Sequence, residues 1–181
     1  MMKRILLVMF VMLLVAATVS AQLPPRAYYG LYVDDTHTTY CITGPGSFTI
    51  YAMVWPSDGG LDSIEFTVTP SAGMIVYLPN LNPDIILSMG NFPGDLVATF
   101  GTCWLEWTVI ADATLMVTGD GTNQEEVIFE PYPGSAFLKF VDCDGNEEEA
   151  VALNYLYANY PTCPEYATRE STWGAIKNMY E

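Results

Sequence analysis

The chain has 181 residues and carries 21 acidic against six basic side chains, which gives a formal net charge of −15 at pH 7. A surface this acidic repels nucleic acids and anionic membranes, so binding to either by charge is excluded. The length suits a single domain with a sizeable core.

The first residues predict export. Residues 1–4 are positively charged, residues 5–17 are apolar without a charge, and Val19-Ser20-Ala21 is a small-residue cleavage site before Gln22. This is the pattern of a secretory signal peptide. The alternative is a retained membrane anchor, but the apolar run is shorter than the ~20 residues that a spanning helix needs. We expect cleavage, no membrane span in the mature chain, and a secreted, periplasmic or cell-surface location.

Alternating side chains predict strands in the first half of the mature chain. Residues 28–33, 47–55 and 64–68 each place apolar side chains on one side and more polar ones on the other. The second and third of these stretches flank the turn cluster at residues 56–60. We therefore expect them to form a hairpin with a five-residue loop.

The stretch from Gly101 to Ala111 has the same two-residue period. Cys103, Trp107 and Val109 share one side of an extended chain, together with Leu105 and Ala111. Tryptophan and β-branched residues fit a pleated surface, so these residues predict one central strand. A cysteine on its apolar side looks like a core staple.

Further short strands are expected at residues 74–78, 85–88, 96–100, 114–118, 127–129, 136–143 and 150–157. Turn residues separate them, and the helical period is almost absent. The sequence thus predicts an all-β, immunoglobulin-like β-sandwich of about nine short antiparallel strands. An outer-membrane barrel is the alternative, but internal prolines, four cysteines and a polar C-terminus argue against it.

The last residues differ from the rest. Trp173, Ile176, Lys177 and Tyr180 fall on one face of a short helix, which predicts an amphipathic segment. Such a helix is marginal alone and needs a docking surface on its own domain or on another protein. We divide the chain into a signal peptide (residues 1–21), a β-sandwich domain (residues 22–163) and this docking tail (residues 164–181).

Four cysteines follow the signal peptide: Cys41, Cys103, Cys143 and Cys163. An even number in an oxidising compartment predicts two disulfides, and three connectivities are possible. We favour Cys41–Cys103, which would tie an early loop to the central strand, with Cys143–Cys163, which would staple the last hairpin. The spacing lacks a CxxC pair, so a zinc site is not expected.

Several short motifs resemble a loose group of secreted, uncharacterised proteins predicted from uncultured bacterial genomes. The motifs are Gly30-Leu-Tyr-Val-Asp34, Cys41, the aromatic strand at residues 49–55, Phe66, Gly101-Thr-Cys103, Val141-Asp-Cys143 and Cys163. The Trp173–Lys177 ending is similar to the ends of other secreted proteins of such bacteria. The resemblance implies export and an immunoglobulin-like sandwich, and it implies no known activity.

Calcium binding is the most specific chemistry that the sequence offers. Hard cations prefer clustered oxygen ligands, and one acidic turn supplies Asp142, Asp144, Asn146 and Glu147. The spacing partly imitates an EF-hand loop, although Gly145 is misplaced and no helices flank the turn. The alternative interpretation is a solvated hairpin turn.

Two other features bear on function. His37 is the only histidine, and in its polar loop it is expected to be a turn residue rather than a catalytic base. Tyr51, Trp55, Trp104 and Tyr132 could form a platform for a sugar, although aromatic strand residues usually serve packing.

These features favour a secreted, non-catalytic binding or structural module, not an enzyme, that recognises a protein or glycan at the cell surface. A calcium-stabilised carbohydrate- or surface-binding module is the alternative, and a small extracellular hydrolase is a distant third. Apart from calcium, no cofactor is expected.

Overall fold

Twelve β-strands are present in the computed structural model, which describes residues 26–118 and 121–163. They are β1 (Ala27–Tyr32), β2 (Cys41–Ile42), β3 (Gly46–Trp55), β4 (Leu61–Pro70), β5 (Met74–Leu81), β6 (Ile85–Gly90), β7 (Gly94–Trp104), β8 (Thr108–Val117), β9 (Glu125–Glu130), β10 (Lys139–Val141), β11 (Glu147–Ala152) and β12 (Leu156–Ala158). The all-β class is confirmed, but the expected strand count was too low. These residues include no helix that could span a lipid bilayer.

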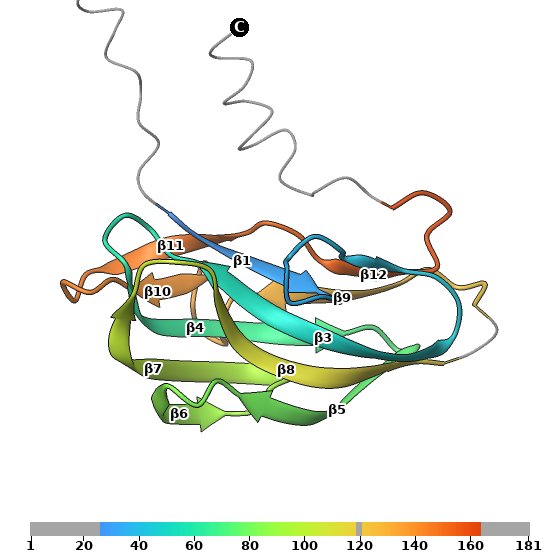
Figure 1. The fold of residues 1–181 in the computed structure, drawn as a ribbon, viewed down its shortest axis with the longest axis horizontal. Helices are drawn as coiled ribbons and strands as arrows, with labels where there is room; N and C mark the ends of the chain where they lie inside the picture. Colours follow the sequence, from blue (N-terminus) through green and yellow to red (C-terminus); the bar gives the residue numbers. More distant parts are fainter. Residues whose placement is uncertain (1–25, 119–120, 164–181) are drawn as a thin grey trace, which may run out of the picture.

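The strands form the two layers of a sandwich (Figure 1). Sheet A has the order β11-β1-β3-β8-β5. Sheet B has the order β2-β12-β9-β4-β7-β6. Strand β10 also belongs to sheet B and pairs with β4 beside the segment that pairs with β9.

Strand β11 joins the two layers along one side. Its first half, Glu147 to Glu149, pairs with β10 of sheet B, and its second half, Ala150 to Ala152, pairs with β1 of sheet A. The β1–β11 pair is parallel, as is the β2–β12 pair. The expectation of purely antiparallel strands was therefore wrong.

The core lies between the layers and contains an aromatic centre. Tyr29 of sheet A contacts Phe66 and Phe129 of sheet B, with ring centroids 5.4 and 5.6 Å apart. Burial raises the pKa of the Tyr29 hydroxyl, which donates a hydrogen bond to the carbonyl of Lys139 at 2.7 Å. A buried hydroxyl needs such a partner, so this bond lets a tyrosine serve as core.

The alternation read from the sequence is confirmed on three strands. Their inward side chains are fully or almost fully buried: Tyr29 and Leu31 on β1, Ile50, Ala52 and Val54 on β3, and Ile64, Phe66 and Val68 on β4. The period of two thus identified both the strands and the faces that they bury.

The predicted central strand from Gly101 to Ala111 is wrong. Strand β7 ends at Trp104 in sheet B, and β8 begins at Thr108 in sheet A. Leu105, which was assigned to the buried side, is 65% exposed. The chain crosses between the layers here without a Gly or Pro to mark the change, so the alternation continues through a connection.

The predicted hairpin between residues 47–55 and 64–68 is also wrong. Strand β3 pairs with β1 and β8 in sheet A, whereas β4 pairs with β7, β9 and β10 in sheet B. The residues 56–60 that looked like a hairpin loop carry the chain from one layer to the other. Sequence neighbours therefore lie in opposite sheets.

Candidate functional site

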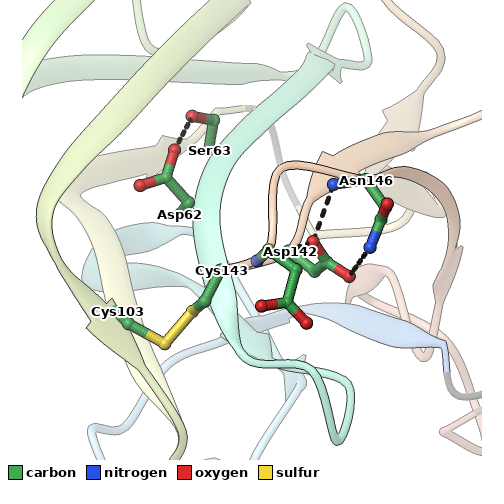
Figure 2. Close-up of a disulfide and its surroundings, with 7 residues drawn as sticks. Asp62, Ser63, Cys103, Asp142, Cys143 and Asn146 are labelled. Carbon is green, nitrogen blue, oxygen red and sulfur yellow. Dashed lines mark hydrogen bonds between the residues drawn. A yellow bond between two sulfur atoms is a disulfide. The ribbon is translucent and has the colours of Figure 1, made fainter.

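The acidic turn after β10 is organised around Asp142 (Figure 2). One oxygen of its carboxylate accepts hydrogen bonds from the N–H groups of Asp144 and Asn146, and the other accepts one from the Asn146 side-chain amide. These bonds, led by that of the Asn146 side chain, lower the pKa of Asp142. The carboxylate thus closes the turn by satisfying its backbone donors.

Two other predicted calcium ligands of this turn have different surroundings. Asp144 is exposed, and Glu147 forms an ion pair with Lys139 at 2.8 Å. Within the described residues no three His, Cys, Asp or Glu side chains group closely enough to hold a metal ion. A calcium site at Asp142, Asp144, Asn146 and Glu147 stays a prediction of the sequence.

Two disulfides connect the four cysteines, with a pairing that differs from the favoured one. Cys41 is bonded to Cys163, and Cys103 is bonded to Cys143. The favoured pairing assumed that Cys103 lies in a central strand. It instead lies near the exposed end of β7, where the turn after β10 brings Cys143 within reach, as Figure 2 shows.

The Cys103–Cys143 disulfide covers the loop that joins β3 to β4. The N–H of Cys143 donates a hydrogen bond to the carbonyl of Gly59 at 3.1 Å. At Gly60 the backbone has φ +80°, and a Cβ there would lie 2.5 Å from the Cys143 sulfur. Only glycine fits this position, because it needs both the left-handed backbone and the missing side chain.

His37 belongs to an aromatic cluster on the outer side of sheet A. Its ring stacks on Trp107 with centroids 4.7 Å apart, and Trp107 also contacts Trp55 and Tyr32. The Asp34 carboxylate holds the loop by accepting hydrogen bonds from Thr36, Thr38 and Thr39. Although desolvation acts in the opposite direction, these bonds keep the pKa of Asp34 well below its usual value.

The predicted sugar platform is divided by the fold. Trp55 is 41% exposed on the outer side of sheet A, beside Trp107. Trp104 lies at the end of β7 in sheet B and packs against Phe100 of the core. The interpretation of Trp55 and Trp104 as one platform was therefore wrong, because the two strands belong to different layers.

The docking tail was predicted from Trp173, Ile176 and Tyr180. These residues, and with them the expected C-terminal helix, lie outside the described part of the chain. The signal peptide at residues 1–21 lies outside it as well. Both stay predictions.

The outward side of sheet B carries a row of hydroxyl and carboxylate groups. The Thr67 hydroxyl donates to Asp95 at 2.7 Å, and Ser63 donates to Thr99 at 3.1 Å. Two further hydroxyl–carboxylate bonds join Thr69 to Glu130 and Ser135 to Glu65. We call the outward side chains of β4, β6, β7, β9 and β12 the sheet B face.

The sheet B face is bordered by two unlike margins. On β6, Leu87 and Met89 are 63% and 60% exposed, and they pair with Thr99 and Val97 of β7. At the opposite margin Tyr157 contacts three other tyrosines: Tyr40, Tyr155 and Tyr160. Burial and the nearby Glu126 raise the pKa of Tyr157 to about 12.

The sequence shows that residues 63–67 have a polar side, but it does not reveal the sheet B face. The strand that contains Thr67 alternates visibly, yet its cross-strand partners Asp95 and Glu130 lie 28 and 63 positions further along the chain. Their partnership follows from the order of strands in the sheet. Local alternation has no signal for it.

A groove of about 410 Å³ lies beside β11. Phe137, Val151 and Tyr155 are among the side chains that line it. Arg26 and Glu149 also line it and approach each other to 3.8 Å. Its size is that of a small-molecule site, but its polar groups form an ion pair with each other rather than converging on a ligand.

No protein-family model and no curated protein sequence matches the chain. Its fold is similar to those of cohesin structures. A chain from a type I cohesin–dockerin complex of Clostridium thermocellum aligns with a TM-score of 0.51 at 9% identity, over 75% of this chain and 94% of that one. The third cohesin ScaC of Acetivibrio cellulolyticus, in complex with the ScaB dockerin, aligns with a TM-score of 0.51 at 12% identity, over 72% and 96%.

A type III cohesin module from the cell-surface anchoring scaffoldin ScaE of Ruminococcus flavefaciens is similar to the same degree. It aligns with a TM-score of 0.50 at 10% identity, over 77% of this chain and 93% of that module. At these identities the likeness establishes the fold alone. The chain has a cohesin-like β-sandwich. The alternation of its strands predicts a β-sandwich, and the comparison narrows the type of sandwich.

Proposed function

We propose that this chain is an exported, non-catalytic module that binds a protein partner on its sheet B face. The observation that carries the proposal is the composition of that face: acidic and hydroxyl groups between an apolar margin and a tyrosine margin. Tyrosine and methionine are enriched in protein interfaces. The cohesin-like fold supports the same class of function, since two of the similar structures are described as cohesin–dockerin complexes.

The charge of the face indicates the chemistry of the partner. Asp95, Glu130 and Glu65 lie on it, and the described residues contain just two cations, Arg26 and Lys139, both paired with glutamates. A partner with lysine or arginine side chains between apolar contacts would complement this surface. Such complementarity also speeds association and makes it sensitive to salt.

Affinity capture from the secreted proteins of the producing organism tests the proposal. The bait is the mature chain, compared with Glu130→Lys on the sheet B face and with Asp112→Lys on the outer side of sheet A. The control matches well, because Asp112 also accepts a side-chain hydrogen bond from a neighbouring strand, from Asn80 at 2.9 Å. We expect a protein that is retained by the mature chain and by Asp112→Lys and lost by Glu130→Lys.

Either of two results would overturn the proposal: a partner that both variants retain, or one that only Asp112→Lys loses. Melting curves of the three proteins show whether each variant is folded. Glycan binding is the second candidate, because Trp55 exposes its ring beside Trp107. A soluble oligosaccharide that quenches tryptophan fluorescence, with the quenching lost in Trp55→Ala, would favour it.

A further inference from the structure

Strand β6 forms the free edge of sheet B. It pairs with β7 on one side, and no other strand of the described residues pairs with it. An unpaired strand presents a row of N–H and C=O groups that can accept another strand. In Figure 1, β5 and β6 both lie at the lower edge of the sandwich.

The other sheet also ends in a free strand on this side, but that strand is protected. Strand β5 contains Pro79, and its register with β8 shifts between Tyr77 and Asn80. Leu78 at this irregularity has φ 51°, a left-handed value that is unusual for leucine. Proline and a bulge are the devices that normally prevent a strand from being added to an edge.

Strand β6 has neither proline nor charge along its length, and its register shift with β7 lies between Ile85 and Leu87, before the centre of the strand at Ser88. Its sequence from Ile85 to Gly90 is Ile-Ile-Leu-Ser-Met-Gly, and Ile86, Leu87 and Met89 are 71%, 63% and 60% exposed. In a chain with net charge −15, a six-residue neutral stretch with three exposed apolar side chains is a pronounced exception. Exposed apolar edges of this kind are expected to be covered in the working protein.

We propose that β6 pairs with β6 of a second copy of this chain, in an antiparallel dimer about a two-fold axis at Ser88. The charge of the chain favours a second copy as the partner of β6. Two copies of so acidic a chain repel each other over most of their surfaces, and they meet without like charges along this neutral strand. A basic partner would gain more from the acidic groups of the sheet B face.

An axis at Ser88 brings exposed apolar side chains of the two copies together. In an antiparallel pair, directly opposite residues point to the same face of the sheet. With the axis at Ser88, Leu87 of one copy lies opposite Met89 of the other, and both point outward. Asp84 precedes the strand, so the two copies of this aspartate lie at opposite ends of the pair.

Such a dimer joins two copies of sheet B into one continuous sheet. The apolar margins then meet at the centre, with the acidic groups of the two copies on either side. Homodimers with this symmetry bury the same patch on both subunits. The inference goes beyond the proposed partner binding, and each can fail alone, because mass reports the dimer whereas retention of a partner reports the face.

Light scattering and sedimentation of the mature chain test the dimer over a range of concentrations. We expect twice the mass of one chain. Leu87→Glu places like charges against the two-fold axis and should raise the dissociation constant by at least about tenfold. Ile75→Glu is the matched control, because Ile75 is a 48% exposed apolar residue on the protected strand β5. It should leave the mass unchanged.

A cysteine at the axis tests the register. Directly opposite residues have Cβ atoms about 4.5–5.5 Å apart, so Ser88→Cys should give a covalent dimer on mild oxidation, whereas Ser47→Cys, exposed on β3, should not. A mass of one chain at every concentration would overturn the proposal. A dimer that Leu87→Glu leaves intact, or that Ser47→Cys cross-links equally well, would overturn it too.

Discussion

The hydroxyl of Thr67 on β4 donates a hydrogen bond to the carboxylate of Asp95 on β7 at 2.7 Å. The two residues are direct cross-strand partners on the sheet B face. The bond fixes the orientation of Asp95, so the negative charge has a defined position before a partner binds. Preorganisation of this kind reduces the entropy that binding must overcome.

Thr67→Val removes this bond while keeping the shape of the side chain. We expect the free energy of unfolding to fall by about 0.5–1.5 kcal/mol, the usual net contribution of a hydrogen bond. Urea denaturation measures the change. Thr114→Val, outward on β8 of sheet A, is the control, and a Thr67 variant no less stable than this control would contradict the account.

The Cys103–Cys143 disulfide leaves no room for a side chain at position 60. In Gly60→Ala the new Cβ would lie 2.5 Å from one sulfur and 2.7 Å from the other, on a backbone with φ +80°. We expect a loss of about 2–4 kcal/mol, because strain and overlap add. Chemical denaturation of the oxidised protein gives the value.

Gly134→Ala separates these two contributions. Gly134 also has a positive φ, +93°, but a Cβ there would meet no atom within 4 Å. This variant should therefore lose only about 1–2 kcal/mol, the cost of the left-handed backbone. Equal losses at the two positions would mean that contact with the disulfide is unimportant.

The two disulfides should differ in what they contribute. Cys41 and Cys163 close a loop with a sequence separation of 122, against 40 for Cys103 and Cys143. In the chain-entropy model the longer loop is worth about 1 kcal/mol more. Denaturation of the two Cys→Ser double variants measures the difference, and non-reducing peptide mapping tests the pairing itself. A Cys41–Cys103 peptide would contradict the structure.

Acid should loosen the loop that carries His37. The pKa of Asp34 is lower in the folded chain than in the unfolded one, because Thr36, Thr38 and Thr39 donate hydrogen bonds to its ionised form. A depressed pKa gives stability that is fully present above the unfolded value of ~3.9 and is lost as the pH falls below it. We expect the melting temperature of the wild type to fall more steeply below about pH 4 than that of Asp34→Asn.

The neighbouring exposed residue provides the control for this loop. Asp35→Asn removes an exposed carboxylate of the same loop and so controls for the change in net charge. Tryptophan fluorescence offers a second readout, since the loop holds His37 against Trp107. If the melting temperatures of the wild type and of Asp34→Asn fall with pH in the same way, the Asp34 carboxylate does not stabilise the loop.

How far the sequence predicts this fold depends on the range of each interaction. Alternation is a local property, so it identified β1, β3 and β4 together with the side chains that they bury. It also misled at Leu105, where a connection between the layers keeps the period of a strand. Proximity in sequence misled at residues 56–60, because a short loop usually closes a hairpin but here leads to the other sheet.

The sheet B face and the disulfides depend on contacts between distant parts of the chain. Cys103 and Cys143 meet because β7 and β10 flank the same strand, β4, and nothing local to either cysteine records this. Likewise Thr67, Asp95 and Glu130 become neighbours only when the strands are ordered. Composition could indicate an acidic surface, but the side of the sandwich that carries it required the topology.

The most direct test of partner binding on sheet B is a hydrogen-exchange footprint, recorded with the protein that the mature chain retains and Glu130→Lys loses. We expect slowed exchange in peptides that cover β4, β7 and β9, with β3 and β8 of sheet A unchanged. Protection of β3 and β8 instead would contradict it and would place recognition on the side of Trp55 and Trp107.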